Sequence, residues 1–259
     1  MQKRIICGFC LLILCVVSLG SKKKPVKSTP VAGGQWQLTF MDDFSDRKVD
    51  TSKWNIGDRN TENYDGGANV YDSSNCYTEN NALFIRAVPD TKTDKKGNKQ
   101  YVSSRVTSKG KMSFQFGKIE VRARLPGTKG MWPAIWLLPT DGSWPPEIDI
   151  MEMVGDDPTA IYMTQHFGTR DNHQFKQGDF TGPDFTQDFH IFSIEWDANS
   201  IRWLIDGEER FKSTTNIPTK PMYLIMNTSV GGDWPGMPDD GSVFPNYLIV
   251  DYVKVYKKN

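Results

Sequence analysis

The sequence has little cysteine, no charge imbalance and no cluster of metal-binding residues. Three of its four cysteines lie within the first 15 residues, which leaves Cys76 alone in the rest of the chain. A single cysteine excludes an intramolecular disulfide there, and we interpret Cys76 as a small buried hydrophobic residue. No group of cysteine and histidine has zinc-site spacing. The formal net charge is zero and no basic stripe is present, so nucleic acid is not an expected partner.

The sequence also lacks a convincing amphipathic helix and any internal repeat. Short alternating runs separated by turn residues recur instead, and they predict an all-β sandwich. The clearest run has apolar residues at every second position from Ile119 to Leu125. Asp206-Gly207 predicts a hairpin turn, and the lysine-rich residues 90–100 predict a surface loop. The predicted strands cover residues 35–44, 82–87, 118–125, 189–196, 201–205, 208–211, 222–226 and 247–256.

The first 34 residues predict an export signal followed by a linker. Lys3 and Arg4 precede an apolar stretch at residues 5–17 that is too short for a spanning helix, so residues 1–20 predict a secretory signal peptide. The residues before Ser21 also resemble the lead-in to a bacterial lipoprotein cleavage site, where cysteine comes next. Either Ser21 replaces a lipid-accepting cysteine or simple cleavage occurs. We interpret residues 21–34 as a linker, and expect a secreted, periplasmic or cell-surface protein.

A run of three acids in six residues organises the remaining chain, residues 35–259. This run, residues 147–152, is otherwise apolar and begins after two prolines, which predicts a strand. Side chains alternate along a strand, so Glu147 and Asp149 share one face while Glu152 would lie on the apolar face. An unpaired carboxylate in the core is costly, and a β-bulge near Ile150 or Met151 would return Glu152 to the face of the other acids.

Three carboxylates on one face suit one familiar reaction. Hydrolysis of a glycosidic bond needs a carboxylate and a carboxylic acid on either side of the bond, about 5–5.5 Å apart when configuration is retained. Because the charges repel, one group is held protonated near neutral pH while another stays ionised. The alternative is a solvated acidic strand face without any catalytic role, and the motif by itself favours that alternative.

The residues around the acidic strand change this balance. Residues 130–139, with sequence GMWPAIWLLP, are followed by Trp144-Pro145-Pro146 and then the acids, and this arrangement resembles glycoside hydrolase family 16, in its bacterial laminarinase or β-1,3(4)-glucanase branch. The resemblance implies a catalytic domain over residues 35–259, with a β-jelly roll of two antiparallel sheets and a concave substrate cleft. It implies Glu147 as nucleophile, Glu152 as general acid/base and Asp149 as the residue that tunes both.

The same resemblance suggests residues that bind substrate. Trp132, Trp136, Trp144 and Trp234 are candidates for stacking on sugar rings, with core packing as the alternative; adjacent proline or glycine favours loop positions for all except Trp136. Asn75 and Arg105 match positions that hydrogen-bond sugar hydroxyls, and His166 matches a cleft histidine. Their alternatives are a turn residue, an exposed strand cation and a structural histidine. Asp251 resembles a side-chain ligand of a structural calcium ion, although the chemistry requires no cofactor.

The expected function is therefore that of a retaining endo-β-glucanase, with a β-1,3 or mixed-linkage glucan as its polymer partner. No protein partner is implied, and we expect a monomer. Two alternatives stay open at this stage. One is a hydrolase of galactans such as agarose or porphyran on the same fold. The other is a non-catalytic β-glucan-binding protein, which the three acids at residues 147–152 disfavour.

Overall fold

The computed structural model describes residues 36–57, 60–61, 68–93 and 96–259, so the predicted signal peptide and linker lie outside the described residues. Strands dominate this part of the chain, and no helix in it is long and apolar enough to cross a membrane. The strands are β1 Trp36–Asp42, β2 Asn55–Ile56, β3 Asn60–Thr61, β4 Asn69–Tyr71, β5 Cys76–Glu79, β6 Ala82–Thr93, β7 Lys99–Ser103, β8 Arg105–Thr107, β9 Gly117–Arg124, β10 Met131–Pro139, β11 Glu147–Glu152, β12 Ala160–Thr169, β13 Asn172–Thr181, β14 His190–Trp196, β15 Ile201–Ile205, β16 Glu208–Ser213, β17 Met222–Val230 and β18 Asn246–Lys258, with a short 3₁₀ helix, η2, at Ser73–Asn75.

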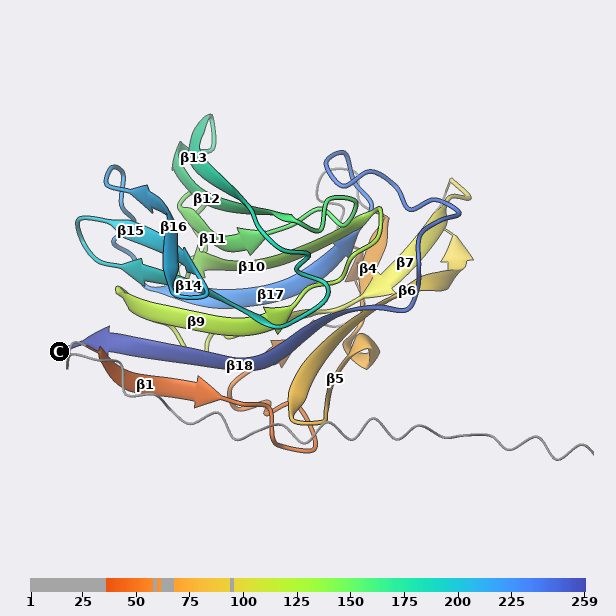
Figure 1. Cartoon of the computed structure of the whole chain (residues 1–259), viewed down its shortest axis with the longest axis horizontal. Helices are drawn as coiled ribbons and strands as arrows, with labels where there is room; N and C mark the ends of the chain where they lie inside the picture. Colours follow the sequence, from red (N-terminus) through yellow and green to blue (C-terminus); the bar gives the residue numbers. More distant parts are fainter. Residues whose placement is uncertain (1–35, 58–59, 62–67, 94–95) are drawn as a thin grey trace, which may run out of the picture. The chain divides into compact units, whose positions relative to one another are not determined.

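The strands form two sheets that pack face to face (Figure 1). The larger sheet has the order β16-β15-β14-β9-β18-β6-β7-β4-β3, with β1 beside β18 and β5 beside β6. The smaller sheet has the order β13-β12-β11-β10-β17-β8-β2. Neighbouring strands are antiparallel except for β4 and β7, which pair in parallel. The predicted all-β sandwich is confirmed, with this one departure from an antiparallel arrangement.

The core lies between the sheets and is built by alternation along the strands. In β9, Ile119, Val121 and Ala123 are at most 1% exposed and face inward, as the alternating pattern predicts. In β10, Ile135 and Leu137 are buried opposite them in the same cluster. The residues between these inward positions must therefore point out of the sandwich, which is how the outer face of the smaller sheet acquires its functional side chains.

Two local predictions have different outcomes. The hairpin between β15 and β16 is confirmed, because Asp206 and Gly207 both have positive φ, 54° and 84°, as the predicted tight turn requires. The prediction for residues 90–100 is right that the segment lies at the surface but wrong that all of it is loop. β6 continues to Thr93 and β7 begins at Lys99, with Thr93 and Lys99 paired. This hairpin is largely exposed, so polar residues form strands there without the apolar alternation that marks a buried face.

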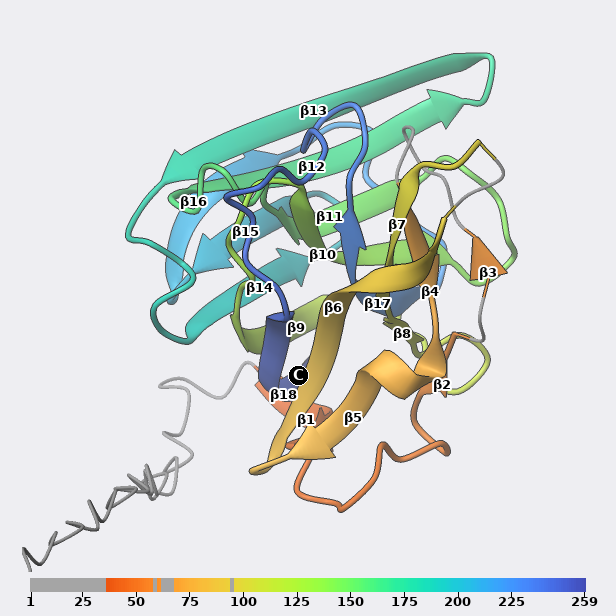
Figure 2. The same cartoon turned by 90° about the vertical axis from the view of Figure 1, so that its right-hand side faces the viewer.

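The chain closes on itself at the larger sheet. β1, the first described strand, pairs with the end of β18, from Trp36 opposite Lys258 to Asp42 opposite Val253. Asp42 also accepts a hydrogen bond from the indole nitrogen of the fully buried Trp54, at 2.7 Å. In the smaller sheet, the long hairpin of β12 and β13 forms one edge (Figure 2).

Candidate active site

A groove of about 1000 Å³ runs across the outer face of the smaller sheet. Its floor comes from alternate residues of five adjacent strands, β17, β10, β11, β12 and β13, which point away from the core. In β10 these are Trp132, Ala134, Trp136 and Leu138, the residues between the buried core positions. The loop before β11 and the turn containing Trp234 add side chains to the rim.

The acidic strand β11 contributes all three of its carboxylates to this groove. Ile148 lies opposite Gln165 of β12, and Asp149 lies opposite Thr164, but the next paired residue is Glu152, opposite Tyr162. Two residues of β11 therefore stand against one residue of β12, which is a β-bulge. The predicted bulge is confirmed, and it places Glu152 on the same face as Glu147 and Asp149.

Each of the two catalytic glutamates is held by a tryptophan indole. Trp132 donates from Nε1 to Glu152 Oε1 at 2.9 Å, and Trp144 donates from Nε1 to Glu147 Oε2 at 2.7 Å. Both indoles line the groove, but the hydrogen bonds show that they also orient the two carboxyl groups. Trp132 lies inside strand β10 and not in a loop as predicted, whereas Trp144 lies in the connection before β11.

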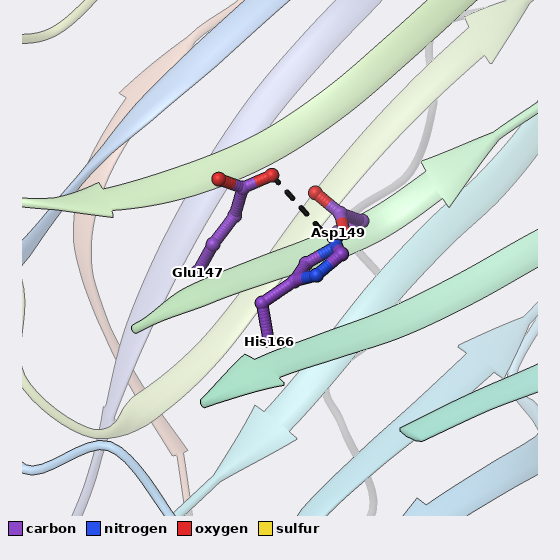
Figure 3. A group of neighbouring side chains, drawn as sticks. All are labelled: Glu147, Asp149 and His166. Carbon is purple, nitrogen blue, oxygen red and sulfur yellow. Dashed lines mark ion pairs between the residues drawn. The ribbon is translucent and has the colours of Figure 1, made fainter. Parts of the chain in front are cut away.

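His166 joins the acids from the neighbouring strand. Its Nε2 lies 2.9 Å from Asp149 Oδ2 and 4.0 Å from Glu147 Oε1, and Figure 3 shows these side chains pointing toward one another from β11 and β12. The other ring nitrogen, Nδ1, lies 2.8 Å from Nε2 of His173 on β13. A line of contacts therefore runs from Glu147 and Asp149 through His166 to His173 at the exposed rim.

Burial dominates the electrostatics of the acids. Burial and the nearby Asp149 carboxylate raise the pKa of Glu147 to about 8, while His166 and the Trp144 indole act in the opposite direction. Burial and the charge of Glu152 raise the pKa of Asp149 well above its usual range. Asp149 is only 2% exposed, so burial acts on it at least as strongly as on Glu147. The two neighbouring carboxyl groups therefore titrate as a coupled pair, and burial keeps both from being fully ionised at neutral pH.

Aromatic rings gather on both sides of the acids. Trp234, which is 40% exposed, contacts Trp132 and Tyr162 edge to face, at centroid distances of 5.4 and 5.0 Å. Beyond Glu147, the Trp144 ring lies 4.9 Å from His173, which in turn lies 6.2 Å from the exposed Phe175. These two clusters flank the acids and offer apolar faces to the flat surfaces of sugar rings.

The remaining predicted binding residues divide into two groups. Trp136 and Arg105 line the groove; the Trp136 indole donates to Asn227 Oδ1 at 2.7 Å, and Arg105 packs over the Tyr71 ring at 5.4 Å. Asn75 does not line the groove. It is 3% exposed in η2, where its Oδ1 accepts a hydrogen bond from Arg86 Nε at 2.9 Å. The predicted contact of Asn75 with sugar hydroxyls is therefore wrong, and Asn75 instead supports the neighbouring sheet.

The predicted calcium ligand Asp251 already has a cation as its partner. Its Oδ2 lies 2.7 Å from Nη1 of Arg122, so a metal ion using this oxygen would compete with a guanidinium. Among the described residues, the group whose side-chain atoms lie close enough to hold a metal is Glu147, Asp149 and His166, within 4.8 Å of one another. The side chains around Asp251 thus do not fit a calcium site, and the proposed reaction uses no metal.

Several groove residues have no counterpart in the sequence-based predictions. His173 and Phe175 come from β13, a strand that is exposed along most of its length and shows no apolar alternation. Thr164 belongs to β12, and the hydrogen-bonded pair Asn227 and Ser229 belongs to β17. Asn227 and Ser229 continue the period of two that starts at Tyr223, and both lie past residue 226, where the predicted strand ends. This period is the sequence signal that could have identified them.

An all-β sandwich with a groove across one sheet, and with two indole-bound glutamates on the face of a bulged strand, defines the protein as a glycoside hydrolase in architecture. Residues 48–246 match the family model described as glycosyl hydrolases family 16, and the chain belongs to this family. The predicted family and its jelly-roll fold are therefore confirmed.

Relatives match along most of the chain. A β-glucanase from Rhodothermus marinus is 33% identical over 253 residues, which cover 86% of this chain and 85% of that protein. Glucan endo-1,3-β-glucosidase A1 from Niallia circulans is 34% identical over 278 residues, which cover 93% of this chain but 40% of that protein. The catalytic domain of an endo-1,3-β-glucanase (laminarinase) from Thermotoga petrophila RKU-1 superposes with a TM-score of 0.79 at 35% identity, covering 88% of this chain and 100% of that structure.

Proposed function

We propose that this protein is a retaining endo-β-glucanase that cleaves β-1,3 or mixed-linkage β-1,3-1,4 glucans. One observation carries the proposal: Glu147 and Glu152 share the groove face of β11 because of the bulge, and each accepts a hydrogen bond from its own tryptophan. Two separately held carboxyl groups on one side of a sugar-sized groove are the arrangement that double displacement needs. The relatives from Rhodothermus marinus and Thermotoga petrophila, a β-glucanase and an endo-1,3-β-glucanase, support a glucan as substrate.

The reaction follows from the environments of the two glutamates. Glu147, as carboxylate, attacks the anomeric carbon and forms a glycosyl ester while the bond to the leaving oxygen breaks. Glu152 gives its proton to that oxygen, so the leaving chain departs as an alcohol. Glu152 then takes a proton from water as the water attacks the anomeric carbon, which breaks the ester and restores both carboxyl groups. The two inversions give a product of retained configuration.

Asp149 and His166 prepare Glu147 for this role. Burial raises the pKa of Asp149, and in its protonated form Asp149 can donate a hydrogen bond to the Glu147 carboxylate and adds no second negative charge. His166 contacts both acids at 2.9 and 4.0 Å and fixes their orientation from β12. These residues act on the glutamate and need not touch the sugar.

Release of reducing ends from four polymers tests the proposal. Laminarin and barley mixed-linkage glucan should be hydrolysed, with a rapid fall in viscosity that indicates internal cleavage. Agarose and carboxymethylcellulose should release few or no reducing ends. Hydrolysis of agarose alone would favour a galactan hydrolase. Binding of laminarin without release of any reducing ends would favour a non-catalytic glucan-binding protein.

We also propose that the protein is exported, because the basic and apolar pattern of residues 1–20 is that of a signal peptide. If Ser21 replaces a native cysteine, the native form is anchored by lipid at the cell surface. Membrane fractionation of Ser21→Cys beside the unchanged chain tests the anchor. A product of Ser21→Cys found entirely in the soluble fraction would contradict it.

A further inference from the structure

The charges that line the groove are unevenly distributed. Among the described residues, its acidic side chains are the three acids of β11, at residues 147–152. Its cationic side chains are Arg105, Lys109 and Arg170. Within the described part of the chain, the groove therefore has three acidic and three basic side chains, and the two kinds differ in where they lie along it.

Two of these cations stand at the Glu147 end of the groove. Trp144, whose indole binds Glu147, lies beneath Arg170, with 6.0 Å from the guanidinium carbon to the ring centroid. Lys109 Nζ lies 5.6 Å from the centroid of Tyr223, which pairs across the sheet with Leu138 of β10. The neighbouring residue of β10, Leu137, pairs with Ile148 beside Glu147, so both cations belong to this end.

The aromatic rings position these cations without neutralising them. A cation over a ring face is attracted by about 0.5–1 kcal/mol at exposed sites, and its charge stays available to a ligand. Neither Lys109 nor Arg170 forms an ion pair with a carboxylate of the described residues. The nearby Asp141 is paired with Lys220 instead, at 2.8 Å. Arg105 lies away from this end of the groove, in line with Glu152 across β17 and β10.

We propose that the Glu147 end of the groove binds a sugar that carries an anionic substituent, a carboxylate or a sulfate ester, on the β-glucan chain. This inference rests on the proposed glucanase function and adds the chemical class of the substrate to it. Lys109, over Tyr223, or Arg170, over Trp144, would form a charge-assisted hydrogen bond with an anion at this end of the groove. Burial raises the pKa of both Glu147 and Asp149, which reduces the negative charge at this end of the groove.

A series of β-1,3-glucans of equal length tests the inference. The series contains unsubstituted laminarin, lightly carboxymethylated laminarin, lightly sulfated laminarin and, as a neutral control of similar bulk, hydroxyethylated laminarin. At low salt the wild-type protein should show kcat/KM about fivefold or more higher on an anionic glucan than on the hydroxyethylated one, as two exposed ion pairs would give. The preference should decline as sodium chloride is added, because salt screens exposed charges. The carboxymethylated and sulfated members distinguish the two kinds of anion.

Substitution identifies the groups responsible. Lys109→Gln with Arg170→Gln should remove the preference, so that within this variant kcat/KM on the anionic and the hydroxyethylated glucans agrees within about twofold. Lys212→Gln, an exposed lysine of β16 outside the groove, should keep the preference and serves as the control. Equal rates on anionic and neutral glucans, or a preference that survives the double substitution, would overturn the inference while the proposed function stands. Hydrolysis of none of the four polymers would contradict the proposed function and the inference with it.

Discussion

At the scale of single residues, the site is a set of carboxyl groups whose protonation is controlled by what touches them. Burial favours the neutral form of all buried acids, so a buried nucleophile needs contacts that favour its charged form. For Glu147 these contacts are the Trp144 indole and His166. Asp149 has the deeper position, and burial raises its pKa well above the ordinary range. The difference between two acids only two residues apart therefore arises from their neighbours.

Removal of the indole N–H should shift the pH profile. In Trp144→Phe the ring remains, but Glu147 loses a donor that favours its carboxylate, so its pKa rises. The acidic limb of kcat/KM should move to higher pH by about one unit, because a hydrogen bond to a charged group is worth about 1.5–3 kcal/mol and one pKa unit corresponds to 1.36 kcal/mol. Trp136→Phe is the matched control, since its indole donates to Asn227 and not to an acid. An equal shift in both variants would contradict the assigned role of Trp144.

The raised pKa of Glu147 also predicts a pH-dependent cost in stability. Its folded value, about 8, lies above its ordinary value of 4.5, so its contribution to stability is fully present below 4.5 and is lost as pH rises through 8. Glu147→Gln cannot ionise and should escape this loss. At pH 8.5 the variant should melt about 5 °C above the wild type, since half of the shift is worth about 2 kcal/mol and each kcal/mol moves the melting temperature by about 2–4 °C.

Calorimetry or circular dichroism at pH 5 and pH 8.5 measures this difference. The gap between Glu147→Gln and the wild type should be small at pH 5, where both side chains are largely neutral. A gap that is independent of pH would show that Gln stabilises the fold by packing, and that Glu147 does not ionise at the expense of stability.

At the scale of elements, the bulge in β11 decides which face the acids occupy. Strict alternation would place Glu152 among the core residues, and the extra residue between Asp149 and Glu152 prevents this. The bulge could be predicted from the sequence because an uncompensated carboxylate in a core is too costly to accept. The partner strand could not be predicted in the same way, because the pairing of β11 with β12 depends on residues that alternation alone does not align.

Two single-residue deletions in β11 should separate the effect of the face on which the acids lie from the effect of losing one residue. Deletion of Ile150 removes the bulge but leaves Glu147, Asp149 and Glu152 alternating on the groove face, so the variant should fold and keep measurable hydrolysis. Deletion of Ile148 removes a residue of the same type with similar burial, but forces one acid toward the core. That variant should fail to fold or lose all activity. Circular dichroism and reducing-end release check both variants, and equal behaviour of the two would contradict this role of the bulge.

The hairpin of β12 and β13 shows why part of the site could not be predicted from the sequence. β9 was predicted well because its buried residues alternate with polar ones, the pattern of a strand with one face in the core. β13 is an edge strand that is exposed on both faces along most of its length, so its sequence has no such pattern. His173 and Phe175 were missed for that reason. The prediction that Asn75 lies in the groove rests on the resemblance alone, because the sequence does not show its hydrogen-bond partner Arg86.

At the scale of the whole molecule, contacts between distant parts of the sequence hold the sandwich together. β1 completes the larger sheet by pairing with β18, more than 200 residues later. β1 also brings Asp42 to the Trp54 indole and to Lys53, whose Nζ lies 3.4 Å from Asp42 Oδ1. None of these three residues lines the groove, so their contacts should govern stability without changing the chemistry.

Truncation tests this division. A chain that begins at residue 36 should melt at the same temperature as one that begins at residue 21. A chain that begins at residue 43 lacks β1, which leaves the edge of β18 unpaired and the buried indole of Trp54 without its acceptor. An unmet buried donor costs about 1–3 kcal/mol, so the melting temperature should fall by at least about 4 °C, and the open edge should promote aggregation. An unchanged melting temperature after removal of β1 would show that this pairing is dispensable.

The central claim is that Glu147 forms a covalent intermediate while Glu152 acts as acid and base. Proton NMR of the first product released from a β-1,3-glucan oligosaccharide, recorded before mutarotation, measures it most directly. Double displacement predicts that the new reducing end appears first as the β-anomer, the configuration of the bond that was cut. Initial appearance of the α-anomer would mean a single displacement by water, and the assignment of Glu147 as nucleophile would then fail.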